Sequence, residues 1–218
     1  MPESLMFPFL LLIALVVVGG FALGTGWNVR KGDVVLKWLR DGLPLIGERT
    51  TLRWLGSSVV ELKMAKANAP YRTVETLVVF EPRDVVFLWA WSRLQGRRDL
   101  LIFRGHLNAA PRYEVEIFDP QGWTTHHTER DVLKKNWTRA ELPESPSLRA
   151  YYSGSAGVDA AQSLTAVATR AGGKLVRLSV HRNTPNVEAH WLLPNPTAYS
   201  ARNIFESLRQ IGEQVIRG

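Results

Sequence analysis

The sequence predicts an α+β protein in which an N-terminal single transmembrane helix precedes a soluble domain of antiparallel sheet covered by helices. Three observations indicate this fold class. Residues 5–23 form a long apolar run, later segments alternate apolar and polar residues with a period of two, and amphipathic segments with helical spacing stand between them. A period of two is typical of half-buried strands, and helices interleaved with hairpins are typical of α+β domains.

The apolar run is long enough to cross a membrane. No charged residue occurs between Ser4 and Val29, and about 20 apolar residues in a helix cross a hydrocarbon core of about 30 Å. A secretory signal peptide instead has a basic start and an apolar stretch of about 7 to 15 residues. Here the run is longer, and the only charge before it is Glu3. We therefore expect residues 1–29 to be an uncleaved transmembrane anchor.

The charges beside the run predict its orientation. Lys and Arg near the end of a span stay on the cytoplasmic side of the membrane. The flank before the run carries no basic residue, whereas six follow it: Arg30, Lys31, Lys37, Arg40, Arg49 and Arg53. The soluble domain is therefore predicted to be cytoplasmic. Trp27 closes the run and is expected at the membrane interface, where tryptophan is enriched.

The composition narrows the classes of function. All 27 Lys and Arg, but only 19 of the 20 Asp and Glu, follow the apolar run, so the domain carries a net charge of +8. A basic domain is attracted to an anionic inner leaflet, whereas scattered basic residues without a motif make nucleic acid an unlikely partner. The chain has no cysteine, which excludes disulfides, thiolate catalysis, zinc–thiolate sites and iron–sulfur clusters. No cofactor is predicted.

The first part of the domain, residues 30–142, is predicted to begin with a short helix over 33–41, which Gly42 and Pro44 should end. Alternating strands follow at 52–54 and 60–64, and a more apolar strand over 71–80 is expected in the centre of the sheet. Residues 100–107 and 112–118 resemble a hairpin joined at 108–111. Periodicity is lost from 119 to 147, where Pro143 and Pro146 mark a connector.

The second part, residues 143–218, is predicted to contain a strand at 148–152, a helix from 157 to Gly172, a hairpin and a final amphipathic helix over 199–216. With the hairpin turn placed at 184–187, Val180 opposes Trp191 and His181 opposes His190. The order strand, helix, strand, strand thus occurs twice in the domain. We interpret this order as two similar architectural units.

The segment 84–94 is unusual because seven consecutive apolar residues, 85–91, form a helix without a polar face. Three interpretations remain open: a helix or strand in the core, an element at the membrane interface, or a docking surface for a partner. The last two share an exposed apolar surface flanked by arginines. The predicted membrane or partner contacts are Trp27, Phe87, Trp89, Trp91, Arg93, Arg97 and Arg98.

The sequence offers only weak candidates for chemistry. His181 and His190 would lie close enough to share a metal in the predicted register, but a third ligand is not evident. The pair His126-His127, followed by Glu129 and Asp131, is a similar case in a loop.

A second weak candidate is an anion site at the start of the predicted helix, where free N–H groups attract negative charge. Its residues are Ser153, Gly154, Ser155 and Gly157. A tight turn from strand to helix explains the same residues without a ligand, because the loop lacks the lysine of a phosphate-binding P-loop.

No catalytic signature is present in the sequence, so the leading hypothesis is a non-catalytic, membrane-anchored accessory or interaction protein. Its partners would be the lipid bilayer and a membrane protein. One alternative is a membrane-tethered hydrolase or transferase that acts on an anionic substrate. Another is a protein that binds anionic lipid or nucleic acid.

Overall fold

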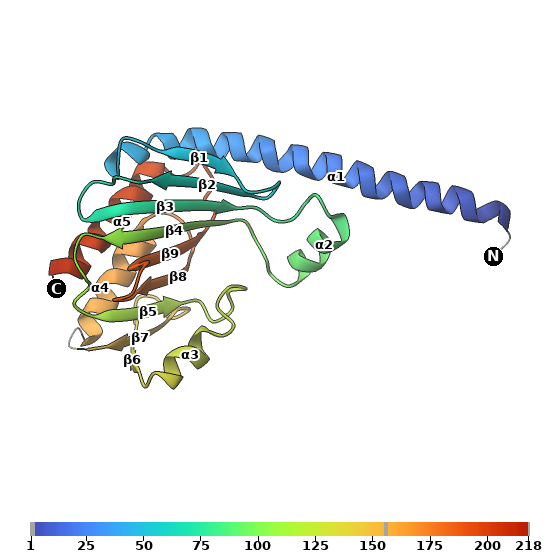
Figure 1. Cartoon of the computed structure of the whole chain (residues 1–218). Helices are drawn as coiled ribbons and strands as arrows, with labels where there is room; N and C mark the ends of the chain where they lie inside the picture. The colour runs from blue at the N-terminus through green and yellow to red at the C-terminus, as the bar shows by residue number, and fades with distance from the viewer. Residues whose placement is uncertain (1–2, 155–156, 218) are drawn as a thin grey trace.

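The structure is a computed structural model that describes residues 3–154 and 157–217. It consists of a long N-terminal helix followed by a nine-stranded antiparallel sheet with helices, which confirms the predicted α+β class (Figure 1). The helical elements are α1 (Glu3–Arg40), η1 (Leu43–Leu45), α2 (Val86–Leu94), α3 (Thr128–Lys134), α4 (Gly157–Arg170) and α5 (Ala201–Arg217). The strands are β1 (Thr51–Trp54), β2 (Val59–Met64), β3 (Tyr71–Val79), β4 (Leu100–Leu107), β5 (Glu114–Phe118), β6 (Thr138–Ala140), β7 (Arg149–Ser153), β8 (Leu175–Val180) and β9 (Val187–Leu192).

Helix α1 is one continuous helix of 38 residues, about 57 Å long at 1.5 Å per residue. The separate short helix predicted over 33–41 is therefore wrong, because it is the last part of α1. The glycines of α1 do not interrupt the helix. At some of them another part of the chain packs closely on the helix backbone. A Cβ atom on Gly32 would lie 2.6 Å from the ring of Trp54. Val35, Trp38 and Leu39 are buried in the core, so α1 is an integral part of the domain.

The strands follow the order β1-β2-β3-β4-β9-β8-β5-β7-β6. The predicted hairpin of residues 100–107 and 112–118 is wrong, because β4 pairs with β3 and β9, whereas β5 pairs with β8 and β7. The β8–β9 hairpin lies between β4 and β5 (Figure 1). Strands from residues 30–142 and 143–218 thus alternate within one continuous sheet.

The predicted register of the β8–β9 hairpin is also wrong. Val180 pairs with Val187, and His190 pairs with Arg177. The backbone N–H of His181 donates to the carbonyl oxygen of Asn186, so the turn lies two residues earlier in the chain than predicted. His181 follows the last residue of β8 and lies four residues from Arg177, the partner of His190, so His181 does not face His190.

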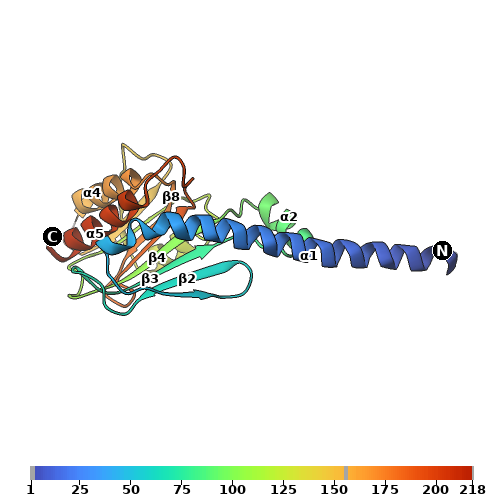
Figure 2. The same ribbon diagram turned by 90° about the horizontal axis from the view of Figure 1, so that it is seen from above.

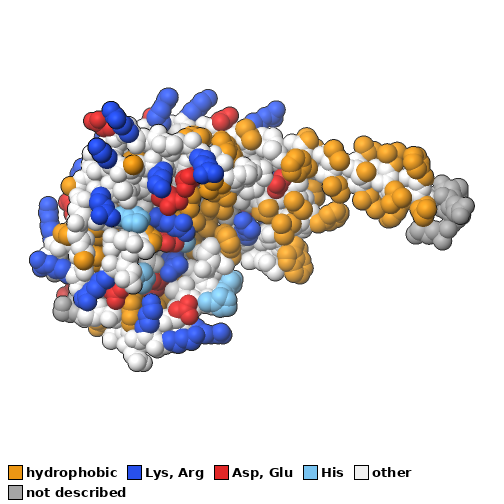
Figure 3. Space-filling model, in the orientation of Figure 1, with side chains coloured by type: hydrophobic (Ala, Val, Ile, Leu, Met, Phe, Trp, Pro, Cys, Tyr) orange, Lys and Arg blue, Asp and Glu red, His pale blue; other side chains and the backbone are white. Residues whose placement is uncertain are grey.

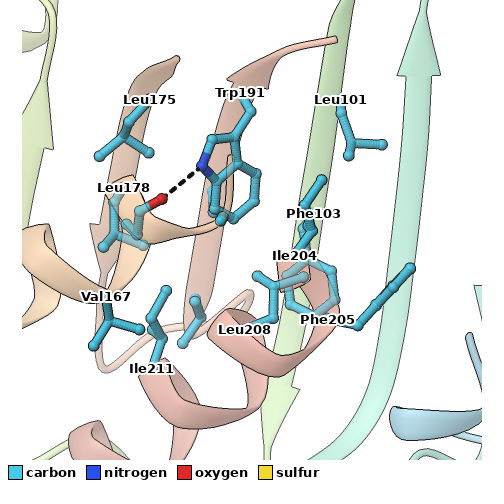
Figure 4. Close-up of a cluster of buried hydrophobic side chains, with 14 of the residues drawn as sticks. Leu101, Phe103, Val167, Leu175, Leu178, Trp191, Ile204, Phe205, Leu208 and Ile211 are labelled. Carbon is cyan, nitrogen blue, oxygen red and sulfur yellow. Dashed lines mark hydrogen bonds between the residues drawn. The ribbon is translucent and has the colours of Figure 1, made fainter. Parts of the chain in front are cut away.

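The helices α4, α5 and the end of α1 cover one face of the sheet (Figure 2). This face holds the main core, in which Trp191 is fully buried between side chains of β4, α4 and α5 (Figure 4). The indole N–H of Trp191 donates a 3.0 Å hydrogen bond to the carbonyl oxygen of Ala168 in α4. The amphipathic stripe predicted in the final helix is confirmed, since Ile204, Phe205 and the apolar positions that follow are buried.

The opposite face of the sheet is covered only in part. Histidine, acidic and basic side chains gather on it (Figure 3). The segment after β5, in which no element is predicted, forms helix α3 and the short strand β6. Phe118, Val132, Trp137 and Tyr151 form a small apolar cluster that holds α3 against the sheet.

Candidate functional site

Helix α2 exposes apolar side chains instead of burying them. Phe87 is 72% exposed, Trp91 63% and Leu94 84%, whereas Ser92 is the buried residue of this helix. The interpretation of 84–94 as a core element is therefore wrong. An exposed apolar cluster of this kind marks a contact with a membrane or a partner in other proteins.

The exposed helix lies beside the apolar part of α1 (Figure 1). An apolar groove of about 270 Å³ runs between them, and its lining is Val16, Val17, Val18, Phe21, Asp84, Val85, Val86 and Phe87. Hydrophobic side chains cover both α1 and α2 on the side seen in Figure 3. The two helices therefore present neighbouring apolar surfaces.

Two glycines of α1 make this approach possible. A Cβ atom on Gly24 would lie 1.9 Å from the carbonyl oxygen of Arg83, and one on Gly20 would lie 2.4 Å from a methyl group of Val86. Gly19 and Gly26 have open space at the corresponding position. The segment before α2 thus packs directly on the backbone of α1 at one face.

A buried polar network joins α1, α2 and the sheet where the apolar run ends. The carboxylate of Glu81 accepts hydrogen bonds from the indole of Trp89 at 2.5 Å and from Arg93 at 3.0 Å. The Glu81 carbonyl oxygen accepts a bond from the side-chain amide of Asn28, which is fully buried. Trp89 is therefore held by the domain, so its side chain is less free for outside contacts than that of Trp91.

Asp99 anchors the other half of this network. Its carboxylate accepts two hydrogen bonds of 3.1 Å from Arg83, one from Lys31 and one of 2.6 Å from the backbone N–H of Glu81. Burial alone would raise the pKa of Asp99, but these donors outweigh burial, and the net pKa is lowered. Lys31 of α1 is thus linked to the loop between α2 and β4 through a buried charge.

The remaining predicted contact residues lie near the junction, the region where α1, α2 and the network of Glu81 and Asp99 meet. Trp27 is 65% exposed on α1. The guanidinium group of Arg97 lies 4.8 Å from the ring centre of Trp123, and Arg98 donates to the carbonyl oxygens of Arg93 and Arg97. The arginines therefore stabilise the end of α2 and its contact with the loop after β5.

His181 lies on the open face of the sheet, against a buried carboxylate. Its Nε2 is 3.1 Å from Glu116 Oε2, while Glu116 Oε1 accepts bonds from Arg177 at 2.5 Å and from Ser179 at 3.0 Å. Burial would raise the pKa of Glu116, but His181 and Arg177 outweigh it, and the net pKa is lowered. Glu116 is thus a buried, ionised carboxylate whose partners come from β8 and from the residue that follows it.

A cavity of about 370 Å³ lies above this group. Glu116, Arg177 and His181 line it from the sheet. The lining from the segment between β5 and β6 is Trp123, Thr124, His126, His127, Thr128, Asp131, Val132 and Lys135. The structure therefore brings His181 to the same cavity as the pair His126-His127, although the sequence placed these histidines in unrelated elements.

The predicted metal pair is not brought together. His190 Nε2 is 2.6 Å from Glu188 Oε1, and each of the two histidines has its own carboxylate. Within residues 3–154 and 157–217, no group of three or more His, Cys, Asp or Glu side chains is arranged to hold a metal ion.

The predicted anion loop lies apart from the cavity. Ser153 ends β7 and pairs with Glu114, and Gly154 and Gly157 have positive φ angles of 97° and 66°. Ser155 lies outside the described residues. Glycine adopts positive φ angles readily, so the backbone conformation accounts for Gly154 and Gly157 without a ligand.

The fold and the junction define the class of the chain as an α+β protein with an N-terminal helix that is long and apolar enough to span a membrane. Comparison with protein-family models and with curated proteins finds no match for this chain.

Asn28, Glu81 and Asp99, which build the buried polar network, are not among the residues predicted from the sequence. Each is a polar residue next to an apolar element: Asn28 follows the apolar run, while Glu81 and Asp99 flank the segment 84–94. Buried polar groups need partners. The signal in the sequence is therefore an acidic residue on each side of an apolar segment that arginines flank.

Proposed function

We propose that this chain is a non-catalytic, single-pass membrane protein whose domain lies in the cytoplasm, rests on the membrane surface and docks onto a membrane-protein partner. The observation that carries the proposal is the exposed apolar side of α2, which lies next to the apolar part of α1. If α1 spans the bilayer, α2 lies beside the C-terminal part of the apolar run, since Val16 and Phe21 line the groove between the two helices. An amphipathic interfacial helix gains free energy when its apolar side chains enter the acyl boundary.

The continuity of α1 supports a fixed orientation of the domain. The last part of α1 packs in the core, and Trp38 donates a 2.7 Å hydrogen bond to the carbonyl oxygen of Tyr199. Lys31 and Asn28 join the junction network. A domain attached in this way presents one end of its strands to the membrane, unlike a domain on a flexible linker.

Depth measurements on the full chain in lipid nanodiscs test the membrane contact. The chain has no cysteine, so Leu94→Cys can carry a single nitroxide label. We expect this label to show high accessibility to oxygen and low accessibility to a polar nickel reagent. Leu133→Cys, at an exposed apolar position of α3, is the matched control and should show the opposite ratio. Equal ratios at the two positions would exclude the proposed contact.

Orientation and partner need separate experiments in native membranes. Asn183→Cys, at an exposed position between β8 and β9, should react with a membrane-impermeant thiol reagent only after the cells are opened. Reaction in intact cells would place the domain outside.

A photo-crosslinking residue at Phe87, compared with one at Leu133, should yield a membrane-protein adduct specific to Phe87 if α2 is the docking element.

A further inference from the structure

The cavity on the open face of the sheet has two polar sides that do not bond to each other. Within the described part of the chain, no hydrogen bond joins Glu116, Arg177 or His181 to the opposite side of the cavity. Helix α3 is instead held by Glu129, which accepts hydrogen bonds from Arg149 and from Tyr151 of β7. The space between the two sides is therefore kept open by contacts at its edge.

The groups around this space are mainly hydrogen-bond donors. Both oxygens of Glu116 are already engaged by β8. The indole nitrogen of Trp123 and the hydroxyl of Thr124 are buried without a hydrogen-bond partner. An indole nitrogen can only donate, and a buried polar atom without a partner is unfavourable. The cavity thus contains at least one buried donor that a ligand oxygen could satisfy.

Cationic side chains frame the same space. The ammonium group of Lys135 lies 5.4 Å from the ring centre of Trp137, which is in turn 5.6 Å from the ring centre of His181. Arg177 uses its Nε for Glu116, and its two terminal nitrogens are further donors. Two carboxylates also line the cavity: Glu116 is paired with Arg177 and His181, whereas Asp131 opposes an anion.

We propose that this cavity binds a phosphate group, carried by a small soluble molecule or by a lipid headgroup. Arginine and lysine donors suit phosphate oxygens, and the volume leaves room for more than the phosphate itself. The segment between β5 and α3 lies at the same end of the strands as α2 (Figure 1), so a headgroup at the membrane surface is as suitable a source as a soluble ester. The site does not depend on the membrane contact proposed above.

Histidine footprinting on the full chain can test both sources with one readout. His126 and His127 are exposed and line the cavity, whereas His106 lies on β4 and does not line it. The rate of histidine carbethoxylation is measured by mass spectrometry in detergent, with inorganic phosphate or glycerol 3-phosphate as the soluble probe. Nanodiscs of phosphatidylcholine with and without phosphatidylglycerol test the headgroup. We expect protection of residues 126–127 but not of His106.

Variants assign the protection to the cavity. Lys135→Gln should weaken binding by about tenfold or more, as the loss of a charged hydrogen bond does. Its neighbour Lys134, which does not line the cavity, is the matched control, and Lys134→Gln should leave affinity unchanged. Asp131→Asn should tighten binding, because it removes an opposing charge. Arg177→Gln is less informative, since it also breaks the buried pair with Glu116.

The outcomes separate the two sources and the failure of the proposal. Protection by a soluble probe that Lys135→Gln reduces supports a soluble phosphate ligand. Protection only with phosphatidylglycerol, again reduced by Lys135→Gln and not by Lys134→Gln, supports a lipid headgroup. Absence of protection in every arm, or equal effects of the two lysine variants, would overturn the proposal.

Discussion

Gly24 and Arg83 lie so close together that a Cβ atom on Gly24 would be 1.9 Å from the carbonyl oxygen of Arg83. This contact fixes the segment before α2 on the backbone of α1. Gly24→Ala should therefore displace the segment and lower the free energy of unfolding by about 1–3 kcal/mol, as overpacking does. Gly19→Ala, which meets open space, is the control for helix propensity. Thermal unfolding in detergent measures the difference, and equal midpoints would contradict the close contact.

Asp99 is the charge that holds Arg83 and Lys31 together at the junction. Asp99→Asn should lower the free energy of unfolding by about 1–3 kcal/mol, because it weakens charged hydrogen bonds to a buried carboxylate while Arg83 keeps its pair with Glu81 and Lys31 is partly exposed. Chemical denaturation measures this change. Asp159→Asn, at an exposed position in the first turn of α4, is the control and should cost far less. A small effect of Asp99→Asn would mean that water compensates the cations.

Acid should weaken the fold through Asp99 and Glu116. The pKa of each is lower in the folded state than the ordinary value of about 4 that applies when the chain is unfolded. Their stabilisation is therefore fully present above that ordinary value and is lost as the pH falls below it toward the folded pKa. Unfolding midpoints between about pH 6 and pH 2.5 should fall steeply below pH 4. Asp99→Asn should flatten this fall, and an unchanged slope would contradict the assignment.

Trp191 links β9 to α4 through its indole hydrogen bond with Ala168. Trp191→Phe removes this bond and leaves a small cavity in the core, so the free energy of unfolding should fall by about 1–3 kcal/mol. Trp27→Phe, at an exposed position of α1, should change it by less than about 0.5 kcal/mol. Denaturant unfolding of the two variants provides the comparison. Similar losses would show that the buried bond contributes little.

The exposed side chains of α2 should contribute to membrane contact but not to the stability of the fold. Phe87→Ser with Trp91→Ser removes two exposed side chains, so stability in detergent should change by less than about 1 kcal/mol. In nanodiscs, the nitroxide label at residue 94 should become more accessible to the nickel reagent. A large loss of stability in detergent would instead mean that these side chains pack within the protein.

The regular elements follow from local patterns of residues. The apolar run, the alternating strands and the stripe of Ile204, Phe205 and Leu208 each determine an element over a few turns or residues, and the structure contains all of them. Local periodicity determines which face of an element is buried, because side chains repeat every 3.6 residues in a helix and every two in a strand.

The pairing of strands depends on distant residues, which local periodicity does not specify. The β8–β9 hairpin lies between β4 and β5, although β4 and β5 are joined by a short connection that favours a hairpin. The turn between β8 and β9 also lies two residues earlier than alternation alone indicates, and Asn186 donates its side-chain amide to the carbonyl oxygen of Arg182 within it. This shift in register separates His181 from His190.

The sequence by itself determined an apolar helix, a basic domain and an arginine-flanked apolar segment. Only the tertiary structure decided that Gly20 and Gly24 bring this segment against α1, that Asp99 joins it to Lys31, and that its apolar side stays exposed. The cavity around Glu116 has the same origin, since His181 and Lys135 meet there from separate elements. The physical reason is that burial and ion pairing depend on long-range contacts, whereas helix and strand periodicity are local properties of the chain.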